Sequence, residues 1–212
     1  MNQNLKSTLI QTYDKIVKEY VEHEFDNPQM NKHYTMFLSL VPKKSKILDV
    51  GCGPGQASKR FSDAGHQVTG IDLSKEMIHF CKKKIPNAKF LVMDAEKISL
   101  TEKFDAIWAA FILVHIPLIK HQKVLNKFFQ ILKPGGIMYL GMLEGQGEKV
   151  MPEPYNRKYK QFFVFCQKKE LIQRINRAGF QVLTYDTEEF NEKGTIFVLS
   201  HTFAKKPKAT PQ

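Results

Sequence analysis

Three glycines at alternate positions, directly after a short strand-like segment, constrain this chain more than any other feature. Residues 46–50 read Lys-Ile-Leu-Asp-Val, and Gly51, Gly53 and Gly55 follow at once. Residues 56–61 then have the pattern of the first turns of a helix. Because glycine has no side chain, such a turn lets the backbone approach a ligand closely. We therefore expect bare backbone amides and a helix N-terminus to face an anionic or electron-rich group.

A second strand pattern at 67–71 ends in an acid, Asp72, about twenty residues after the first glycine, as in nucleotide-binding folds. An acid at this place accepts hydrogen bonds from ribose hydroxyls, which indicates a ribose-containing ligand. The dinucleotide fingerprint also requires a glycine three positions after its second one, and this chain has Gln56 there. A nicotinamide-dependent oxidoreductase therefore stays open as a disfavoured alternative.

Several motifs in a fixed order resemble the class I S-adenosylmethionine-dependent methyltransferases of the small-molecule type. The resemblance begins with residues 48–55 and covers roughly residues 46–143. The later motifs are Asp72-Leu73-Ser74 with Met77, Met93-Asp94-Ala95-Glu96, residues 104–111, Val114-His115-Ile116-Pro117, and Leu132-Lys133-Pro134-Gly135-Gly136. The resemblance implies S-adenosylmethionine as the cofactor, S-adenosylhomocysteine as its product, and an enzyme that transfers a methyl group by direct in-line displacement.

The resemblance implies a cradle for the methionine end of the cofactor. Its members are Asp49, Gly51, Cys52, Gly53, Gly55 and Ala110. Asp49 would fix the turn or reach the amino group through water, and Ala110 would lie near the amine. Tyr13 belongs to a segment, residues 13–20, that resembles an amino-terminal segment folding over the cofactor in small-molecule methyltransferases. The alternative is that the apolar stripe of this segment packs on the sheet.

The nucleoside half of the cofactor is implied to contact Asp72, Leu73, Met77, Asp94, Ala95 and Glu96. The first acid would bind the ribose, and the two apolar residues after it would lie beside the adenine. Asp94 would accept from the adenine amino group, the Ala95 amide would donate to a ring nitrogen, and Glu96 could share the task of Asp94. An aspartate at a strand end can instead cap the next helix, although Ser74 can serve as that cap after Asp72.

His115 is the candidate general base, since it follows the fourth strand pattern at the carboxyl edge of the expected sheet. The ordinary pKa of histidine, near 6.5, would let it take a proton from a phenol, a carboxylic acid or an ammonium group. The alternatives are that His115 packs or caps the loop before Pro117, and that no base is used. The remaining histidines show no metal-ligand spacing, so we expect no metal site.

Strand and helix patterns alternate along the chain, which predicts an α/β fold with a doubly wound, mostly parallel sheet. The resemblance implies seven strands in a Rossmann-like methyltransferase fold, with the last strand antiparallel. Strands are expected near 46–50, 67–71, 89–93, 104–110, 136–142, 180–185 and 195–203, and helices near 55–64, 74–84, 118–132 and 168–178. Length predicts a single domain over 1–204, with an N-terminal helical cap at 1–42, a substrate-side insert at 144–168 and a disordered tail at 205–212.

The composition limits the cellular compartments and the classes of binding partner that suit this chain. No apolar run is long enough to span a bilayer, the N-terminal residues lack a secretory signal, and the three cysteines form no CxxC pair. We therefore expect a soluble, cytoplasmic protein, as a monomer or a homodimer, that acts on a small molecule without a membrane. The net charge of +11 keeps a nucleic-acid substrate open. It is disfavoured because residues 109–112 lack the Asn/Asp-Pro-Pro-aromatic signature of base amino methylation.

The methyl acceptor has two interpretations at this stage. The insert carries the aromatic residues Tyr155, Tyr159, Phe162, Phe163 and Phe165, and the basic residues Arg157, Lys158, Lys160, Lys168 and Lys169. They could bind an aromatic acceptor with a negative group, or the aromatic side chains could fill the core beside a solvated basic face. A third class of function is a protein that binds the cofactor without catalysing a reaction.

Overall fold

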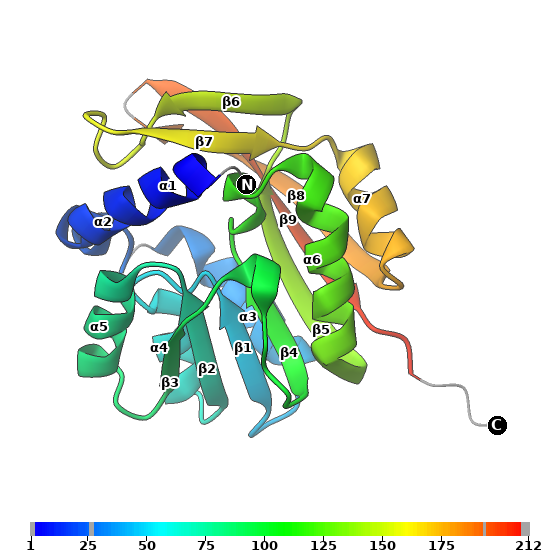
Figure 1. Cartoon of the computed structure of the whole chain (residues 1–212). Coiled ribbons are helices and arrows are strands. Elements are labelled where there is room, and N and C mark those ends of the chain that lie inside the picture. The colour runs from blue at the N-terminus through cyan, green and yellow to red at the C-terminus, as the bar shows by residue number, and fades with distance from the viewer. Residues whose placement is uncertain (1–2, 26–27, 193, 209–212) are drawn as a thin grey trace.

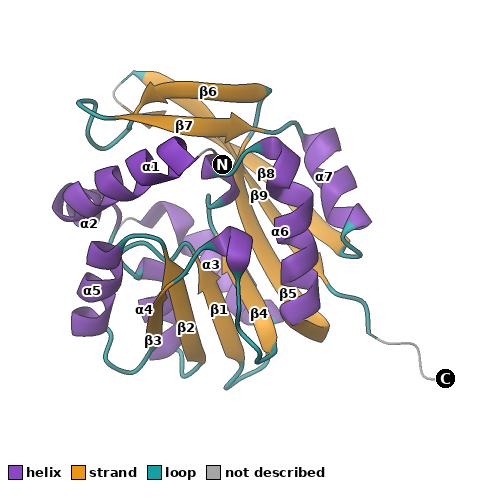
Figure 2. Cartoon of the chain, viewed as in Figure 1, coloured by secondary structure: helices purple, strands orange, loops and turns teal. Residues whose placement is uncertain are grey.

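A central β-sheet runs through the molecule with helices on both of its faces (Figure 1). The computed structural model describes residues 3–25, 28–192 and 194–208. The helical elements, coloured purple in Figure 2, are α1 Gln3–Lys15, α2 Val17–Glu24, η1 Pro28–Met30, α3 Asn31–Leu40, α4 Gln56–Asp63, α5 Lys75–Lys84, η2 Ala95–Lys97, η3 Leu113–His115, α6 Leu118–Ile131 and α7 Lys168–Arg177. The strands are β1 Lys46–Val50, β2 Gln67–Asp72, β3 Lys89–Val92, β4 Phe104–Ala109, β5 Leu132–Leu143, β6 Gly147–Pro152, β7 Lys160–Phe165, β8 Gln181–Glu192 and β9 Thr195–Lys205.

Seven strands form the body of the sheet in the order β3-β2-β1-β4-β5-β9-β8. The first five pair in parallel, and β9 is inserted antiparallel between β5 and β8. This confirms the predicted α/β class, the doubly wound sheet and the antiparallel last strand. Because parallel strands end at the same edge, the loops after β1, β2, β3 and β4 meet at one edge of the sheet.

The insert at 144–168 contains two strands that the sequence analysis did not predict. Strands β6 and β7 form an antiparallel hairpin with register from Gly147–Phe165 to Pro152–Lys160. The hairpin joins the main sheet at one position, Leu143 opposite Phe165. In Figure 1 it lies across one end of the sheet, above α1. The segment was missed because its strands are half exposed and show no regular alternation of polar and apolar residues.

The helices cover the two faces of the sheet around separate apolar clusters. Helices α6 and α7 pack on one face, and α3 and α4 pack on the other (Figure 1). On the second face the Trp108 ring stacks on the Tyr139 ring with centroids 3.8 Å apart, and Phe203 packs against Tyr139. These rings are buried, so burial of aromatic surface fixes β4, β5 and β9 together.

The helices of the N-terminal segment pack in two different places. Helices α1 and α2 are separate, since the backbone leaves helical geometry at the fully buried Ile16. Helix α1 contacts α5 and β7, so it lies between the sheet edge and the hairpin. Helix α3 instead packs against α4 and β5 as part of the sheet cover.

The chain leaves the sheet later than expected. Lys205 is the last residue of β9, although we predicted a disordered tail from this position. The backbone of Lys206 still pairs with Gly135 and Gly136, and its ammonium group donates to the carbonyls of Phe129 and Leu132. Residues 209–212 lie outside the described part of the chain. Among the described helices, none combines the length and the apolar character needed to cross a membrane.

Candidate active site

A single pocket at the carboxyl edge of the parallel strands collects nearly all of the predicted site residues. The predicted residues that line it are Tyr13, Asp49, Gly51, Cys52, Gly53, Asp72, Leu73, Met77, Asp94, Ala95, Glu96, Ala110 and His115. The pocket also takes residues from α1, η1 and the insert. Segments that are far apart in the sequence therefore converge on one cavity.

The glycine turn has the backbone geometry that requires glycine, but its three glycines differ in what they face. Gly51, Gly53 and Gly55 all have positive φ, at +69°, +50° and +86°. Gly51 and Gly53 line the pocket. A Cβ on Gly55 would lie 2.6 Å from Cδ1 of Ile85, so Gly55 lets α4 pack against the end of α5 and lies outside the pocket lining.

The expectation that bare backbone amides of this turn face the ligand is wrong. The amides of Gly51 and Cys52 both donate to the carbonyl of Ile71, at 2.8 and 3.0 Å. The Gly53 amide donates to Oδ2 of Asp72 at 3.0 Å. Buried amides must be paired, and here they tie the end of β1 to the end of β2. The glycines therefore give close approach rather than hydrogen-bond donors.

Asp49 is buried beneath the turn. Its Oδ2 accepts a 2.6 Å hydrogen bond from Oγ of Ser58, in the first half of α4. Burial raises the pKa of Asp49 to about 7, and the bond from Ser58 opposes part of that rise. Asp49 thus connects β1 to α4, which agrees with the interpretation that it fixes the turn.

Asp72 and Ser74 divide the functions of binding and capping as the sequence suggested. Ser74 is the N-cap of α5 and accepts from the Met77 amide at 3.1 Å. Asp72 accepts from the amides of Gly53 and Ser74 through separate oxygens and lines the pocket. Burial raises the pKa of Asp72. Since a carboxylate oxygen accepts more than one bond, Asp72 keeps acceptor capacity toward the pocket.

Asp94 combines a capping role with a charge pair that the sequence did not indicate. Its Oδ1 accepts from the Glu96 amide at 2.9 Å, which caps η2. Lys6 of α1 forms ion pairs with both Asp94 and Glu96, and Lys120 donates to Glu96 at 2.6 Å. Ala95 is buried between these acids. Helix α1 is thereby held over this end of the pocket by charge.

His115 is buried and is positioned by two hydrogen bonds. Its Nδ1 lies 3.1 Å from the Phe162 carbonyl, and its Nε2 lies 2.9 Å from the Tyr13 hydroxyl. A carbonyl only accepts, so Nδ1 carries the proton and Nε2 accepts from Tyr13. Burial lowers the pKa of His115 to about 4. A neutral imidazole whose lone pair is already bonded is a weak proton acceptor, so we interpret His115 as the residue that positions Tyr13.

Glu153 is a pocket residue that the sequence analysis missed. It lies between two prolines after β6, is fully buried, and lines the pocket. Neither of its carboxylate oxygens has a hydrogen-bond partner among the described residues. Burial raises its pKa to about 7, opposed by the nearby Tyr155 amide and Tyr13 hydroxyl. No local pattern marks it, because its burial depends on the hairpin folding over the sheet.

Phe111 is a second residue that sequence reasoning could not single out. It follows β4 with φ of +54°, a conformation that is unfavourable for a bulky residue. Its amide donates to the Gly141 carbonyl, and a Cβ on Gly141 would lie 3.2 Å from the Phe111 ring. Such local strain is typical of binding sites, and Phe111 lines the pocket.

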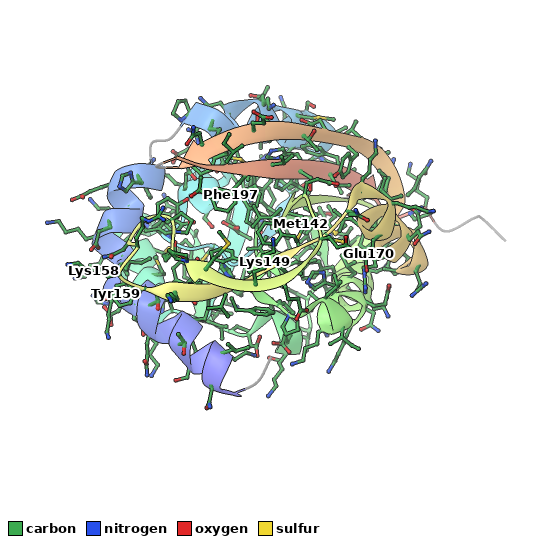
Figure 3. All side chains as sticks on the ribbon, turned by 90° about the horizontal axis from the view of Figure 1, so that it is seen from above. Met142, Lys149, Lys158, Tyr159, Glu170 and Phe197 are labelled. Atoms are coloured by element: carbon green, nitrogen blue, oxygen red, sulfur yellow. The ribbon has the colours of Figure 1, made fainter. Side chains whose placement is uncertain are left out.

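The charges that line the pocket have the opposite sign to the protein as a whole. The pocket carries five carboxylates and one lysine, which are Asp49, Asp72, Asp94, Glu96, Glu153 and Lys6. The basic residues of the insert are exposed and do not line it. In the view from above, Lys158 lies at the periphery whereas Phe197 lies over the middle of the molecule (Figure 3). The positions of the basic insert residues therefore favour the interpretation of a solvated basic face, and of the insert aromatics Tyr155 and Phe163 line the pocket.

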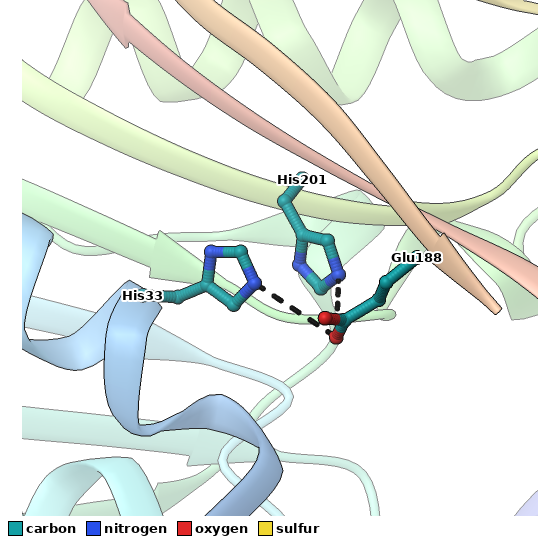
Figure 4. Close-up of side chains that lie close together, drawn as sticks. All are labelled: His33, Glu188 and His201. Carbon is teal, nitrogen blue, oxygen red and sulfur yellow. Dashed lines mark ion pairs between the residues drawn. The ribbon is translucent and has the colours of Figure 1, made fainter. Parts of the chain in front are cut away.

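A separate polar cluster joins α3 to β8 and β9. The Nε2 atoms of His33 and His201 lie 3.9 and 3.1 Å from the same Glu188 oxygen (Figure 4). The three side chains offer metal-ligand atoms within 4.8 Å of one another. However, the two rings stack with centroids 3.7 Å apart and planes 15° from parallel. Their in-plane lone pairs run side by side and do not converge, so we interpret the group as a clasp between elements.

Comparison with known proteins agrees with this geometry. The methyltransferase domain family matches residues 47–136. A demethylmenaquinone methyltransferase of Chlorobaculum tepidum is 36% identical over 100 residues, covering 46% of this chain and 40% of that protein. For the curated relatives compared, the aligned region spans between 37% and 68% of the relative's length.

Solved structures extend the likeness to nearly the whole fold. A S-adenosylmethionine-dependent methyltransferase of Methanosarcina mazei superposes with a TM-score of 0.74 at 20% identity, covering 82% of this chain and 98% of that one. A 1,6-didemethyltoxoflavin-N1-methyltransferase of Burkholderia thailandensis was solved with 1,6-didemethyltoxoflavin and S-adenosylhomocysteine. It superposes with a TM-score of 0.71 at 18% identity, covering 96% of this chain and 88% of that one. Residues 47–136 therefore match the methyltransferase domain family, and the chain as a whole has the fold of these S-adenosylmethionine-dependent methyltransferases.

Proposed function

We propose that this protein transfers a methyl group from S-adenosylmethionine to a small-molecule acceptor. The observation that carries the proposal is the convergence of the glycine turn, Asp72 and Asp94 on one pocket. The residues fit the cofactor, since Gly53 leaves room where a Cβ would meet only Tyr20, at 3.9 Å. Acids at successive strand ends suit the hydroxyl and amino groups of a nucleoside.

The cofactor supplies an activated methyl group on a sulfonium sulfur, so the protein has to bind, orient and exclude water. In our proposal Asp72 accepts from the ribose hydroxyls, and Asp94 accepts from the adenine amino group beside the Ala95 amide. Gly51, Gly53 and Ala110 flank the methionine end. Leu73 and Met77 contact the adenine, while Cys52 and Glu96 contribute lining surface.

Helix α1 would close the site. Tyr13 is held over the pocket by His115, and Lys6 holds the other part of the helix at Asp94 and Glu96. We propose that Tyr13 contacts the methionine end and that α1 excludes water during the transfer.

The remaining expectations are also proposals. Cytoplasmic location is supported by three cysteines that are buried and free. A nucleic-acid acceptor is an alternative supported only by the net charge of +11, while the pocket itself is acidic. A monomer or a homodimer fits the proposal equally.

The test is transfer of a labelled methyl group in a cell extract freed of its own S-adenosylmethionine. The purified protein and methyl-labelled cofactor are added, and the label is followed in separated small-molecule, RNA, DNA and protein fractions. We expect label in the small-molecule fraction. Label in RNA or DNA would replace the proposed substrate class, and no incorporation in any fraction would favour a protein that binds the cofactor without turnover.

A further inference from the structure

We propose that Glu153 binds the acceptor and takes its proton, so that the acceptor is an apolar or aromatic molecule with an amine or hydroxyl nucleophile. The inference rests on the proposed function, because it concerns the second half of the same pocket. It excludes carboxylates and phosphates as the groups that receive the methyl.

The first argument is the missing partner of a buried charge. Glu153 is fully buried, yet neither carboxylate oxygen is hydrogen-bonded among the described residues. A buried polar group without a partner is rare and costly, and a buried carboxylate costs more than a neutral group. The group lines a pocket, so a ligand that donates an N–H or O–H would supply the missing partner.

The second argument is that the other pocket carboxylates already have donors. Asp49 accepts from Ser58, and Asp72 accepts from two backbone amides. Asp94 and Glu96 are paired with lysines. Glu153 therefore differs from the other four in that neither oxygen makes a hydrogen bond of good geometry, although the Tyr155 amide and the Tyr13 hydroxyl lie near enough to oppose the rise of its pKa.

The third argument is that Tyr13 and His115, which line the same pocket, cannot replace it. The Tyr13 hydroxyl donates to Nε2 of His115, so its proton is not directed to Glu153. The other nitrogen of His115 donates to the Phe162 carbonyl. Both titratable neighbours are therefore held in a fixed neutral arrangement, and the carboxylate is the proton acceptor on this side of the pocket.

The surroundings of Glu153 define the rest of the acceptor. Pro154 and Tyr155 follow it in the chain, and Phe163, Phe197 and Leu199 line the same pocket. These side chains favour an apolar or aromatic body. The lining carries five carboxylates and one lysine, so an anionic group would be repelled whereas an ammonium or a neutral donor would not.

The chemical step balances without any further reactant. A lone pair of the acceptor nitrogen or oxygen forms the bond to the methyl carbon, and the electrons of the broken carbon–sulfur bond go to sulfur. The acceptor's proton goes to the Glu153 carboxylate, which becomes a neutral acid and later returns the proton to water. Placing this base beside the nucleophile is general base catalysis.

Binding of matched probes tests the inference without requiring turnover. Benzylamine, benzyl alcohol and benzoate have the same ring but present a cation, a neutral donor and an anion. Each is titrated by NMR into the protein saturated with S-adenosylhomocysteine, for the wild type, Glu153→Gln, Glu153→Asp and Glu189→Gln. Glu189 is an exposed acid on β8, so its variant removes the same charge away from the pocket.

We expect wild type and Glu189→Gln to prefer benzylamine and benzyl alcohol to benzoate. Glu153→Gln should weaken benzylamine by about tenfold or more while S-adenosylhomocysteine affinity stays within twofold, because the variant removes a charge-assisted hydrogen bond to the ammonium group. Glu153→Asp keeps the charge and should keep part of the preference. A probe order unchanged by Glu153→Gln would overturn the inference and leave the proposed function standing.

Two other results distinguish a wrong role for Glu153 from a wrong proposed function. A large loss of S-adenosylhomocysteine affinity in Glu153→Gln would assign the carboxylate to the cofactor's amino group and overturn its role toward the acceptor. Failure of the wild type to bind S-adenosylhomocysteine at all would overturn the proposed function, and with it the inference that depends on it. Circular dichroism spectra of all variants confirm that each is folded before titration.

Discussion

The Tyr13 hydroxyl donates a 2.9 Å hydrogen bond to Nε2 of His115, which joins α1 to the turn after β4. The two rings also meet edge to face, with centroids 5.6 Å apart. This contact places the N-terminal helix directly over the pocket. It also determines the protonation state of His115, since the imidazole must accept from Tyr13 while it donates to the Phe162 carbonyl.

Removing either member of this pair should weaken the same contact. Tyr13→Phe leaves the buried Nε2 without a donor and should cost about 1–3 kcal/mol of unfolding free energy. His115→Ala should lower both turnover and cofactor affinity, because it releases Tyr13 from its place over the methionine end of the cofactor. If His115 acts by positioning Tyr13, the double variant should cost clearly less than the sum of the two single variants.

Urea denaturation and turnover of all three variants measure this coupling. Tyr159→Phe serves as the control, since Tyr159 lies at the periphery of the molecule (Figure 3) and should shift the unfolding free energy by less than about 0.5 kcal/mol. Additive losses in stability and in rate would show that His115 and Tyr13 act independently.

The glycine turn predicts a difference between two alanine substitutions. Gly51 and Gly65 both have positive φ, at +69° and +84°. A Cβ on Gly51 would lie 2.7 Å from Cδ1 of Ile112, whereas nothing lies within 4 Å of one on Gly65. Gly65→Ala should therefore cost only the conformational penalty, about 1–2 kcal/mol. Gly51→Ala should cost more than this, and equal losses in urea denaturation would contradict the steric argument.

The parts of this molecule that the sequence predicts are those encoded locally. The run from β1 through Gly55, the cap at Ser74 and the acid at Asp72 each depend on neighbours within a few residues. Such patterns located the parallel strands, and every predicted site residue except Gly55 lines the pocket. The expectation about the turn amides failed because their acceptor, the Ile71 carbonyl, belongs to the neighbouring strand.

The parts that the sequence does not predict depend on contacts between distant segments. Glu153 lies in a segment without strand or helix periodicity, and only the fold of the β6–β7 hairpin buries it. Lys6 meets Asp94 and Glu96 because α1 crosses the sheet edge. His33, Glu188 and His201 are brought together by the packing of α3 on β8 and β9, which no spacing along the chain indicates.

Glu153 makes stability depend on pH in a predictable direction. Its folded-state pKa is raised to about 7 from 4.5, so the folded protein holds this proton after the unfolded chain has released it. The carboxyl group therefore costs nothing below pH 4.5, and its cost grows between pH 4.5 and 7. Above pH 7 the cost is on the order of 3 kcal/mol.

Glu153→Gln should therefore raise the unfolding free energy at pH 8 and change it little at pH 4.5. Denaturant titrations at the two pH values, with Glu189→Gln as the charge-matched control, measure the difference. A gain of the same size at both pH values would show that the effect is packing and not ionisation. If Glu153→Gln is more stable at pH 8 but loses function, Glu153 serves function at the expense of stability.

The cluster of His33, Glu188 and His201 makes stability depend on pH in the direction opposite to that of Glu153. Burial lowers the pKa values of His33 and His201, although Glu188 and Asp186 oppose this and Lys32 adds to it. A histidine with a lowered folded-state pKa favours folding above its unfolded value of 6.5, and this contribution is lost as the pH falls below 6.5. Acid should therefore destabilise the protein from pH 6.5 downward.

His33→Gln tests this assignment. The variant should reduce the slope of unfolding free energy against pH below 6.5 by up to about 1.4 kcal/mol per pH unit, the limit for one proton. The exposed His79→Gln is the control and should leave the slope unchanged. The same titration with added Zn²⁺ should give superimposable curves, and a Zn²⁺-dependent rise in stability that His33→Gln abolishes would instead identify a metal site.

The measurement that tests the central claim most directly is calorimetric titration with S-adenosylmethionine, S-adenosylhomocysteine and NAD in parallel. We expect the two sulfur compounds to bind the wild type and NAD not to bind. Asp72→Asn should weaken both sulfur compounds by about tenfold or more, because it removes the charge that accepts from the ribose, while the exposed Asp63→Asn should leave them unchanged. Binding of NAD alone, or cofactor affinity indifferent to Asp72→Asn, would contradict the account.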